Sequence, residues 1–244
     1  MNHREIFPFD YSTRNVGDRY PEDFINKLKF ALFLHFTKSE IDTDIDQQIW
    51  GEIFAHITNA RWCITRSDLE NLLLENTAWS VKVIRTNCPA KSSLVGISYL
   101  RPEPHKFFSM HEIVQANPNL TGQMVINIWN ERVTAVMAKY DHLRTVVLMK
   151  SDDLLELAAF ETDTVRYDAA RYDWTWNQNK NLVGLDRATG LKRFTWQPSG
   201  SQFTINEEVP RNRVALRLKQ PPPLDRDQVL ETIQFSESWV EILP

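Results

Sequence analysis

At residues 76–85 the sequence reads Asn76-Thr-Ala-Trp-Ser-Val-Lys-Val-Ile-Arg85, a run that predicts a short buried strand. Its apolar side chains are partly β-branched, as strands favour, and an Asn-Thr pair marks its start. Lys82 stands in the middle of this strand, where a half-buried ammonium is costly unless an anionic group meets it. An aspartate lies upstream, in the spacing Asp68-x11-Ser80-x-Lys82. We therefore expect the fold to be built around Lys82 and its anionic partner.

The length and composition indicate an ordinary folded protein. The chain has 244 residues, of which 42% are hydrophobic and only 7 are glycine, so it can bury a sizeable core in one large domain or in one domain with a small appendage. Its 2 cysteines make no disulfide framework. The longest apolar run, residues 30–36, is too short to span a bilayer. We expect a cytoplasmic protein with no membrane segment.

Charge is uneven along the chain, although the formal net charge is only −4 and the pI about 5.9. Residues 38–76 and 150–173 are rich in acids, whereas residues 80–106 and 187–219 are rich in lysine and arginine. Such bands are typical of a basic face beside a carboxylate-bearing cleft, or of solvated loops that happen to be basic. The bulk charge by itself gives no nucleic-acid signature.

The order of the expected elements predicts a mixed α/β fold. Hydrophobic spacing predicts helices over residues 24–35 and 45–58, the second capped by Asp44 or Asp46. Strands are expected at 62–65, 79–84 and 94–100, then helices near 110–116 and over 122–140, then strands at 144–150 and 154–162. Turn-rich β structure and a helix from about Asp225 complete the chain. We expect a central mixed β-sheet flanked by helices, with residues 1–165 as the core and residues 166–244 as a β-rich C-terminal elaboration packed on it.

The spacing of Asp68 and Lys82 suits the hydrolysis of a phosphodiester. That reaction needs a divalent cation held by carboxylates, and a cation that activates water or holds the phosphate. Neighbouring strands lie about 4.8 Å apart, so an aspartate on one strand and a lysine on the next come close together. Side chains alternate along a strand, so Ser80 and Lys82 share a face.

This pattern resembles the PD-(D/E)xK nuclease fold, in the branch of type II restriction endonucleases with a serine two residues before the lysine. The resemblance covers about residues 45–162, where a helix precedes the sheet and a long helix and a further strand follow it. A closer kinship with restriction-type proteins is suggested by Trp79-Ser-Val-Lys82, Ile128-Trp-Asn-Glu-Arg132 and Phe194-Thr-Trp-Gln-Pro-Ser-Gly-Ser-Gln-Phe-Thr-Ile205.

The resemblance implies a restriction-endonuclease-like core and Mg²⁺-dependent, sequence-specific cleavage of double-stranded DNA. It also implies a homodimer that cuts both strands, and a cognate DNA methyltransferase in the same system. Lys82 would orient or activate water, with the scissile phosphate as its anionic partner, and Ser80 would assist. The metal would be held by Asp68 together with another carboxylate, for which the candidates are Glu52, Glu112 and Glu131.

Two features of the sequence depart from the family pattern. No proline precedes Asp68, and no glutamate follows Lys82 within the next dozen residues. In the serine branch of the family a glutamate of the following helix replaces the missing strand carboxylate, which is why a helix glutamate is needed here. Both departures leave the identity of the second metal ligand open.

DNA contacts would come from the basic bands and from the amides of the last third. Arginine and lysine hold phosphates, whereas glutamine and asparagine recognise adenine edges. On residue type we expect DNA contacts from Arg85, Lys91, Arg101, Arg193, Trp196, Gln197 and Gln202. The loop at residues 174–181 is a candidate to enter a groove. The simpler interpretation is that these amides belong to ordinary polar turns.

Other local interpretations of the Asp68–Lys82 segment stay open. Ser67 could cap a helix with Glu70 as its capping-box partner, which would place Asp68 in a helical turn instead of a strand. Lys82 could extend past an edge strand into water. Either arrangement would separate the two charged groups and remove the basis for the chemistry.

Other sites and another class of function also stay open. A second acidic cluster, a reserve metal site, consists of Asp152, Asp153, Glu161 and Asp163. Cys88, His105 and His111 fit no common zinc spacing, and the sequence contains no glycine-rich phosphate loop or nucleophile elbow. The alternative function is a non-catalytic nucleic-acid-binding or protein-interaction module that uses the tryptophan-rich β region.

Overall fold

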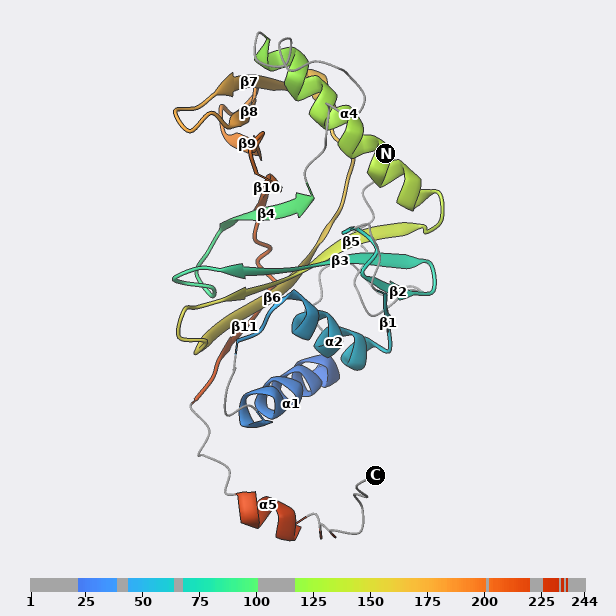
Figure 1. Cartoon of the computed structure of the whole chain (residues 1–244), viewed down its shortest axis with the longest axis vertical. Coiled ribbons are helices and arrows are strands. Elements are labelled where there is room, and N and C mark those ends of the chain that lie inside the picture. The colour runs from blue at the N-terminus through green and yellow to red at the C-terminus, as the bar shows by residue number, and fades with distance from the viewer. Residues whose placement is uncertain are drawn as a thin grey trace, which may run out of the picture.

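The structure is a computed structural model that describes residues 22–38, 44–63, 68–100, 117–200, 202–219 and 226–232, with residues 234 and 236. In Figure 1, helices α1 (Glu22–Lys38) and α2 (Gln47–Thr58) lie below a six-stranded sheet. Helix α4 (Pro118–Met137) and a second, five-stranded sheet lie above it, and α5 (Arg226–Thr232) lies apart near the C-terminus. The predicted mixed α/β class is confirmed.

The helix boundaries follow from local capping. Asp46 caps α2 by accepting the Ile49 N–H at 2.8 Å, and Asn59, in the left-handed region at φ 60°, ends that helix. Asn117 caps α4 in the same way and is followed by proline at the first helical position. The helices expected over 24–35, 45–58 and 122–140 are thus present with small shifts at their ends, whereas the one expected near 110–116 lies outside the described residues.

The first sheet is mixed and has the strand order β1-β2-β3-β5-β6-β11. Its strands are β1 (Arg61–Trp62), β2 (Leu72–Leu74), β3 (Thr77–Arg85), β5 (His142–Lys150), β6 (Glu156–Asp163) and β11 (Val214–Arg217). Strands β3 and β5 are parallel, and the other neighbouring pairs are antiparallel. The parallel pairing requires a crossover, which contains α4, and so the predicted mixed sheet is confirmed.

The second sheet is antiparallel and has the order β4-β10-β9-β8-β7. Its strands are β4 (Leu94–Leu100), β7 (Tyr172–Trp176), β8 (Leu182–Asp186), β9 (Lys192–Trp196) and β10 (Gln202–Glu208), and the short 3-10 helix η2 (Ala169–Arg171) precedes β7. The expected division at residue 165 does not separate the two sheets. Strand β4 comes from the first part of the chain but joins the second sheet, and β11 comes from the last part but joins the first.

Two apolar cores lie on opposite faces of the first sheet. Below it, α1 and α2 pack on a face that includes Trp50, Phe54 and Trp79. Above it, α4 and the second sheet enclose a core that includes Trp129 and Phe203. Because side chains alternate along β3, its odd-numbered residues face the lower core and its even-numbered residues face the upper one. Ser80 and Lys82 therefore point toward β4 and α4.

Helix α4 contacts the second sheet through a glycine. An added Cβ at Gly122 would stand 2.1 Å from ring atom Cδ2 of Trp174, a buried residue of β7. We expect Gly122→Ala to lower the free energy of unfolding by about 1–3 kcal/mol, because the indole has to move in a packed core. Urea unfolding measures this loss. The neighbouring exposed substitution Gln123→Ala should change stability by less than about 0.5 kcal/mol, and an equal effect of both would contradict the close packing.

Among the described residues, no helix has both the length and the apolar character that a membrane crossing needs.

Candidate functional site

Asp68 lies in a turn that is tied back onto β3. Immediately before β2, the Asn71 N–H donates to the Trp79 carbonyl at 2.9 Å, and the Asn71 side chain accepts the Val81 N–H at 3.1 Å. The Ser80 hydroxyl donates to the Asp68 carbonyl at 2.5 Å. Asp68 therefore stands beside β3 although it precedes β2, so the expectation that it lies on a strand is wrong in detail.

The alternative helix around Asp68 is absent from the described residues 68–71, which form a turn and an extended segment leading into β2. Ser67, its proposed cap, lies outside the described residues. Glu70 instead accepts a hydrogen bond from Lys139 Nζ at 2.9 Å. The turn and the hairpin are thus what bring the aspartate and the lysine together.

Lys82 is buried against Asp68. Its Nζ lies 3.2 Å from Oδ2 of Asp68, and its side chain is 9% exposed against 22% for the aspartate. The same Oδ2 accepts the Leu100 N–H at 2.6 Å, and the ammonium lies 4.8 Å from the ring centroid of Tyr99. Burial lowers the pKa of Lys82, and the negative charge of Asp68 opposes that shift. The alternative in which Lys82 extends into water is wrong.

Strand β4 and helix α4 complete the site. The sequence predicts both elements but not their contact with Lys82. Tyr99 packs edge-on against Trp129 of α4, with ring centroids 4.8 Å apart. Arg132, also on α4, donates to the Leu100 carbonyl at 2.7 Å. The backbone of Leu100 is thus held at both its polar groups, by Arg132 at the carbonyl and by Asp68 at the N–H. Since β4 belongs to the other sheet, no local pattern could have paired it with Lys82.

A chain of buried hydroxyls runs from Tyr99 into the first sheet. The Tyr99 and Thr145 hydroxyls are 2.8 Å apart, and Thr145 and Thr164 are 2.7 Å apart. Burial raises the pKa of Tyr99, so its phenol stays protonated and neutral beside Lys82. These hydroxyls fix the ring on which the ammonium rests.

Of the expected carboxylate partners of Asp68, Glu52 lies on the far side of the first sheet. Glu52 is exposed on α2, which covers the opposite face of the sheet, and its Oε1 accepts a hydrogen bond from Gln48 at 2.9 Å. Glu131 is exposed on α4. Within the described parts of the chain, no group of three or more His, Cys, Asp or Glu side chains could hold a metal. The structure therefore brings Asp68, Ser80 and Lys82 together, but not Glu52, and Glu112 lies outside the described residues.

The donor set still suits one metal. Both hydrogen bonds to the Asp68 carboxylate go to Oδ2, and in the described part of the chain Oδ1 accepts none. Mg²⁺ is often held by only one or two carboxylates, with waters and substrate phosphates completing its octahedron. Asp68 Oδ1 could serve as such a ligand, and the Lys82 ammonium, 3.2 Å from Oδ2, could hold an anion beside it.

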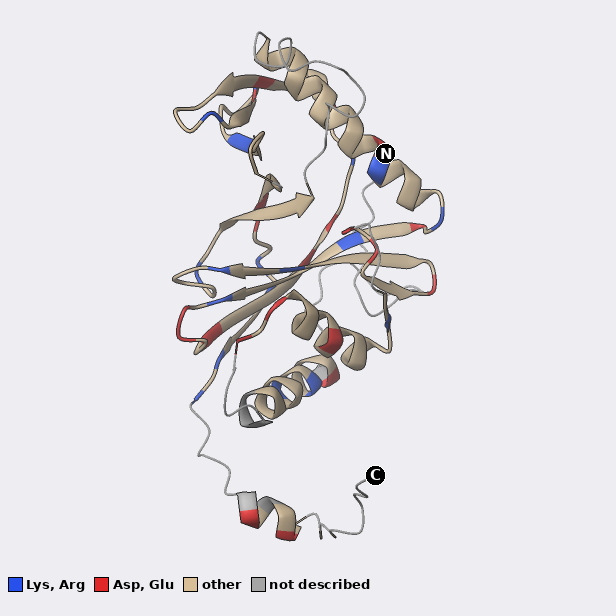
Figure 2. Cartoon of the chain, viewed as in Figure 1, with Lys and Arg blue, Asp and Glu red and all other residues tan. Residues whose placement is uncertain are grey.

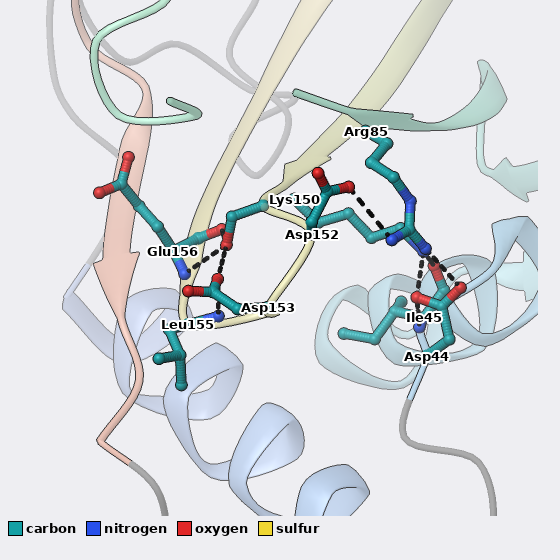
Figure 3. A network of polar contacts seen from close by, with 9 residues as sticks. Asp44, Ile45, Arg85, Lys150, Asp152, Asp153, Leu155 and Glu156 are labelled. Atoms are coloured by element: carbon teal, nitrogen blue, oxygen red, sulfur yellow. Dashed lines mark hydrogen bonds and ion pairs between the residues drawn. The ribbon is translucent and has the colours of Figure 1, made fainter. Parts of the chain in front are cut away.

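Arg85 and Lys91, two of the expected phosphate contacts, lie where β3 ends and in the following loop. Figure 3 shows the Arg85 guanidinium between Asp44 and Asp152, at 3.0 and 3.3 Å, so both carboxylates already neutralise it. Lys91 is exposed in the β3–β4 loop. Arg101 lies outside the described residues. In Figure 2 acidic and basic segments are interspersed around this sheet.

The expected contacts in the second sheet divide into buried and accessible groups. Trp196 is 4% exposed and packs near Trp176, so it belongs to the core and cannot reach DNA in this conformation. Arg193 is bound to the Glu207 carboxylate at 2.7 Å and to the Asn206 carbonyl at 2.6 Å. Gln202 is exposed and Gln197 is half-buried, both at the same end of the sheet.

The second acidic cluster is split along β6. Asp152 and Asp153 lie in the turn before this strand, where Figure 3 shows Asp153 accepting the Leu155 N–H. Glu161 and Asp163 lie at the far end of the strand and, two residues apart, share its lower face. There Arg144 Nε stands 2.8 Å from Glu161 Oε2. The reserve metal site is therefore two separate places, one of which is an ion pair with arginine.

Glu161 gives a stability prediction that depends on pH. Its side chain is 2% exposed, and burial raises its pKa from 4.5 to about 7 against the opposing charge of Arg144. A raised carboxyl pKa stabilises the fold below pH 4.5, and this contribution is lost as pH rises through 7. The free energy of unfolding of Glu161→Gln, measured relative to wild type, is thus expected to rise by on the order of 3 kcal/mol between pH 4 and pH 8.

Urea unfolding at several pH values measures this difference between Glu161→Gln and wild type. The exposed substitution Glu208→Gln serves as the control and should run parallel to wild type across the range. A stability difference for Glu161→Gln that stays constant with pH would contradict a carboxyl titrating near neutrality.

Comparisons with known proteins leave the site to be judged on its geometry: no family model matches this chain, and neither the curated proteins nor the solved structures include a match to it.

Proposed function

We propose that the chain is a Mg²⁺-dependent endonuclease that cuts double-stranded DNA at a specific sequence. The observation that carries the proposal is the contact of 3.2 Å between Lys82 and Asp68, made inside a protein interior. A buried ammonium is retained at a cost in stability, so a functional role for it is a reasonable inference. Ser80 lies between them in the sequence and fixes the Asp68 backbone.

The order of elements supports the same proposal. Helix α2 precedes the antiparallel strands β1, β2 and β3, the crossover with α4 follows, and β5 then pairs in parallel with β3. In the PD-(D/E)xK nucleases that the sequence resembles, the aspartate and lysine come from adjoining strands ahead of a long helix and a further strand. Here the lysine is on β3, and the aspartate lies in the turn before β2. The spacing of the two residues, the hairpin and the crossover together support the resemblance more specifically than the Asp68-x11-Ser80-x-Lys82 pattern alone.

Each residue has a physical role in the proposed reaction. A bound Mg²⁺ would neutralise the phosphate and lower the pKa of a water molecule. Asp68 would hold it through Oδ1, while Oδ2 keeps Lys82 in place. Lys82 would stabilise negative charge on the phosphate and orient the attacking water, in an interior where such interactions are strong. The Tyr99 ring contacts the ammonium from the side of β4, with its centroid 4.8 Å from Nζ.

Two further parts of the proposal concern partners. Cleavage of both DNA strands by one site per chain requires two copies, so the active form would be a homodimer. A specific endonuclease also endangers the DNA of its own cell, so a cognate DNA methyltransferase belongs to the same system.

The test is digestion of phage DNA by the purified chain in Mg²⁺ and in EDTA. Discrete fragments in Mg²⁺ and none in EDTA are expected. Asp68→Asn should abolish the fragments, whereas Asp163→Asn, at the other carboxylate pair, should leave them unchanged. Intact DNA with both Mg²⁺ and Mn²⁺, from a chain that is folded by circular dichroism, would refute the proposal.

A non-catalytic DNA-binding module is the second candidate, and one observation favours it. Asp68 Oδ2 already accepts both Lys82 and the Leu100 N–H, as it would in a purely structural ion pair. This candidate predicts binding that persists in EDTA, falls steeply with salt and leads to no cleavage. A salt titration by filter binding, run beside the digestion, separates the two.

A further inference from the structure

One end of the second sheet carries a continuous row of amide side chains. Gln202 pairs with Leu100 across β10 and β4, and the Gln197 N–H donates to the Gln202 carbonyl at 3.2 Å. On the other side of β9, Leu182 pairs with Trp196, which places the adjacent residue Asn181 beside Gln197. The row ends at Asn177, whose N–H donates to the Asn181 carbonyl at 2.9 Å. Below, the amide row means Gln202, Gln197, Asn181 and Asn177.

The amide row lies on the outer face of the sheet. The residues next to it along the strands, Phe203, Trp196 and Leu182, are buried in the core shared with α4. Because side chains alternate, Gln202, Gln197 and Asn181 point the other way, whereas the Asn177 side chain turns into its own loop. Gln202 and Asn177 are exposed, and so is the whole of the loop at 177–180.

The row begins beside the candidate catalytic site. Leu100, the strand partner of Gln202, gives its N–H to Asp68. From Gln202 to Asn177 the row crosses four neighbouring strands, β10, β9, β8 and β7, and spans about 14 Å, because each strand step is about 4.8 Å. At about 3.4 Å per base pair, that is the length of about four base pairs.

The two ends of this sheet differ in charge. The amide end, residues 177–181 and 197–202, contains Lys180 and no acidic residue. The opposite end carries Asp173, Asp186 and Glu208. Two of these pair with arginines, Asp173 with Arg187 and Asp186 with Arg171. A DNA duplex is a dense polyanion, so it can approach the amide end, whose two segments carry no carboxylate, without charge repulsion from them.

The chemistry of the row fits base edges. A glutamine or asparagine amide donates and accepts at once, which matches the N6 and N7 positions of adenine in the major groove. The loop at 177–181 is itself well fixed, because Asn177 Oδ1 accepts the N–H groups of Asn179 and Asn181 at 3.0 and 2.9 Å. A rigid loop with exposed Gln178 and Asn179 is suited to presenting amides in a fixed geometry.

We propose that the amide row and the loop at 177–181 read adenine-containing base pairs of duplex DNA next to the cleavage centre. The proposal rests on the proposed endonuclease function and names the surface that gives it specificity. Gln202, nearest the centre, reads the position closest to the scissile bond. Gln178 and Asn179 read positions farther along the duplex.

The experiment measures binding without cleavage. The Lys82→Met chain selects duplexes from a random DNA library in Ca²⁺, and the same selection is run with Gln202→Ala or Asn179→Ala added. The parent should enrich a sequence that contains adenine. Each alanine variant should lose discrimination at one position by roughly 5- to 150-fold. Arg187→Gln, at the opposite end of the sheet, should select the parent sequence.

Two results would overturn the proposal: amide variants that select the parent sequence unchanged, or a folded parent that enriches no sequence. In the second case the amide end would be a surface for a protein partner. Digestion by the wild-type chain in Mg²⁺ is scored separately. If wild type cleaves DNA but the alanine variants select the parent sequence, the reading surface is refuted and the nuclease proposal stands. If the selected sequence depends on the amides but wild type does not cleave, the nuclease proposal is refuted.

Discussion

Lys82→Met is expected to reduce DNA cleavage about 10³-fold while the chain stays folded. Loss of a positioned acid, base or charge-stabilising group typically lowers rates by 10²- to 10⁴-fold. Methionine fills a volume similar to that of the lysine side chain and carries no charge, so the packing against Tyr99 is largely kept. Asp68 retains the Leu100 N–H and is partly exposed, so water can replace the lost ammonium. Single-turnover cleavage rates give the loss.

Lys150→Met is the matched control for this prediction. Lys150 is also a buried lysine of the first sheet, 5% exposed, and its ammonium binds the Asp44 carboxylate and the Ile45 carbonyl (Figure 3). It lies at the end of β5, away from the candidate site, so its loss should affect stability but not the rate of the folded fraction. If both variants lost the same factor in cleavage rate, the loss would be a general effect of removing a buried lysine. That result would contradict a catalytic role of Lys82.

Trp79→Ala is expected to cost about 3–5 kcal/mol of folding free energy, the range for a buried aromatic cut to alanine. Trp79 is fully buried on β3, packs edge-on against Phe54 with centroids 5.9 Å apart, and donates from Nε1 to Glu161 at 3.2 Å. Its loss leaves a cavity and a buried carboxylate with one donor fewer. Such a cost is a large part of the 5–15 kcal/mol that typical domains have.

Denaturant unfolding measures the effect of Trp79→Ala. Trp176, a half-buried tryptophan of β7, provides the control, because its substitution by alanine removes less buried surface. A loss below about 1 kcal/mol for Trp79→Ala would contradict its place between β3 and α2.

The central strand and its charged pair could be predicted from the sequence because they depend on local signals. A lysine inside an apolar, β-branched run is conspicuous, because it needs an anionic partner. The expected partner was the scissile phosphate, whereas in the structure the Asp68 carboxylate already lies 3.2 Å from Lys82 Nζ. The position of Asp68 was harder to predict. It depends on Asn71, whose backbone and side chain extend the hairpin beyond the short β2. Because this contact comes from one residue, it produces no periodic pattern in the sequence from which it could be predicted.

The remaining parts of the site depend on contacts between distant segments. Tyr99 and Leu100 reach Lys82 only because β4 pairs with β10 in the second sheet. The residues of β10 that determine this pairing lie about a hundred positions later in the chain. Arg85 was expected to contact phosphate, but it meets Asp44 across the fold. Residue type suggested Trp196 for DNA, yet strand alternation buries it. The charge and aromaticity of a residue indicate what it could bind, whereas the tertiary structure determines what it actually contacts.

The most direct test of the central claim uses a complex formed before cleavage begins. Duplex DNA is bound to wild type or to Lys82→Met in Ca²⁺, Mg²⁺ is then added in excess, and the fraction cut is followed in time. The account predicts that wild type cuts the bound DNA, while Lys82→Met holds the same DNA with similar affinity and leaves it intact. Cutting at the wild-type rate by Lys82→Met would contradict a catalytic centre at Asp68 and Lys82.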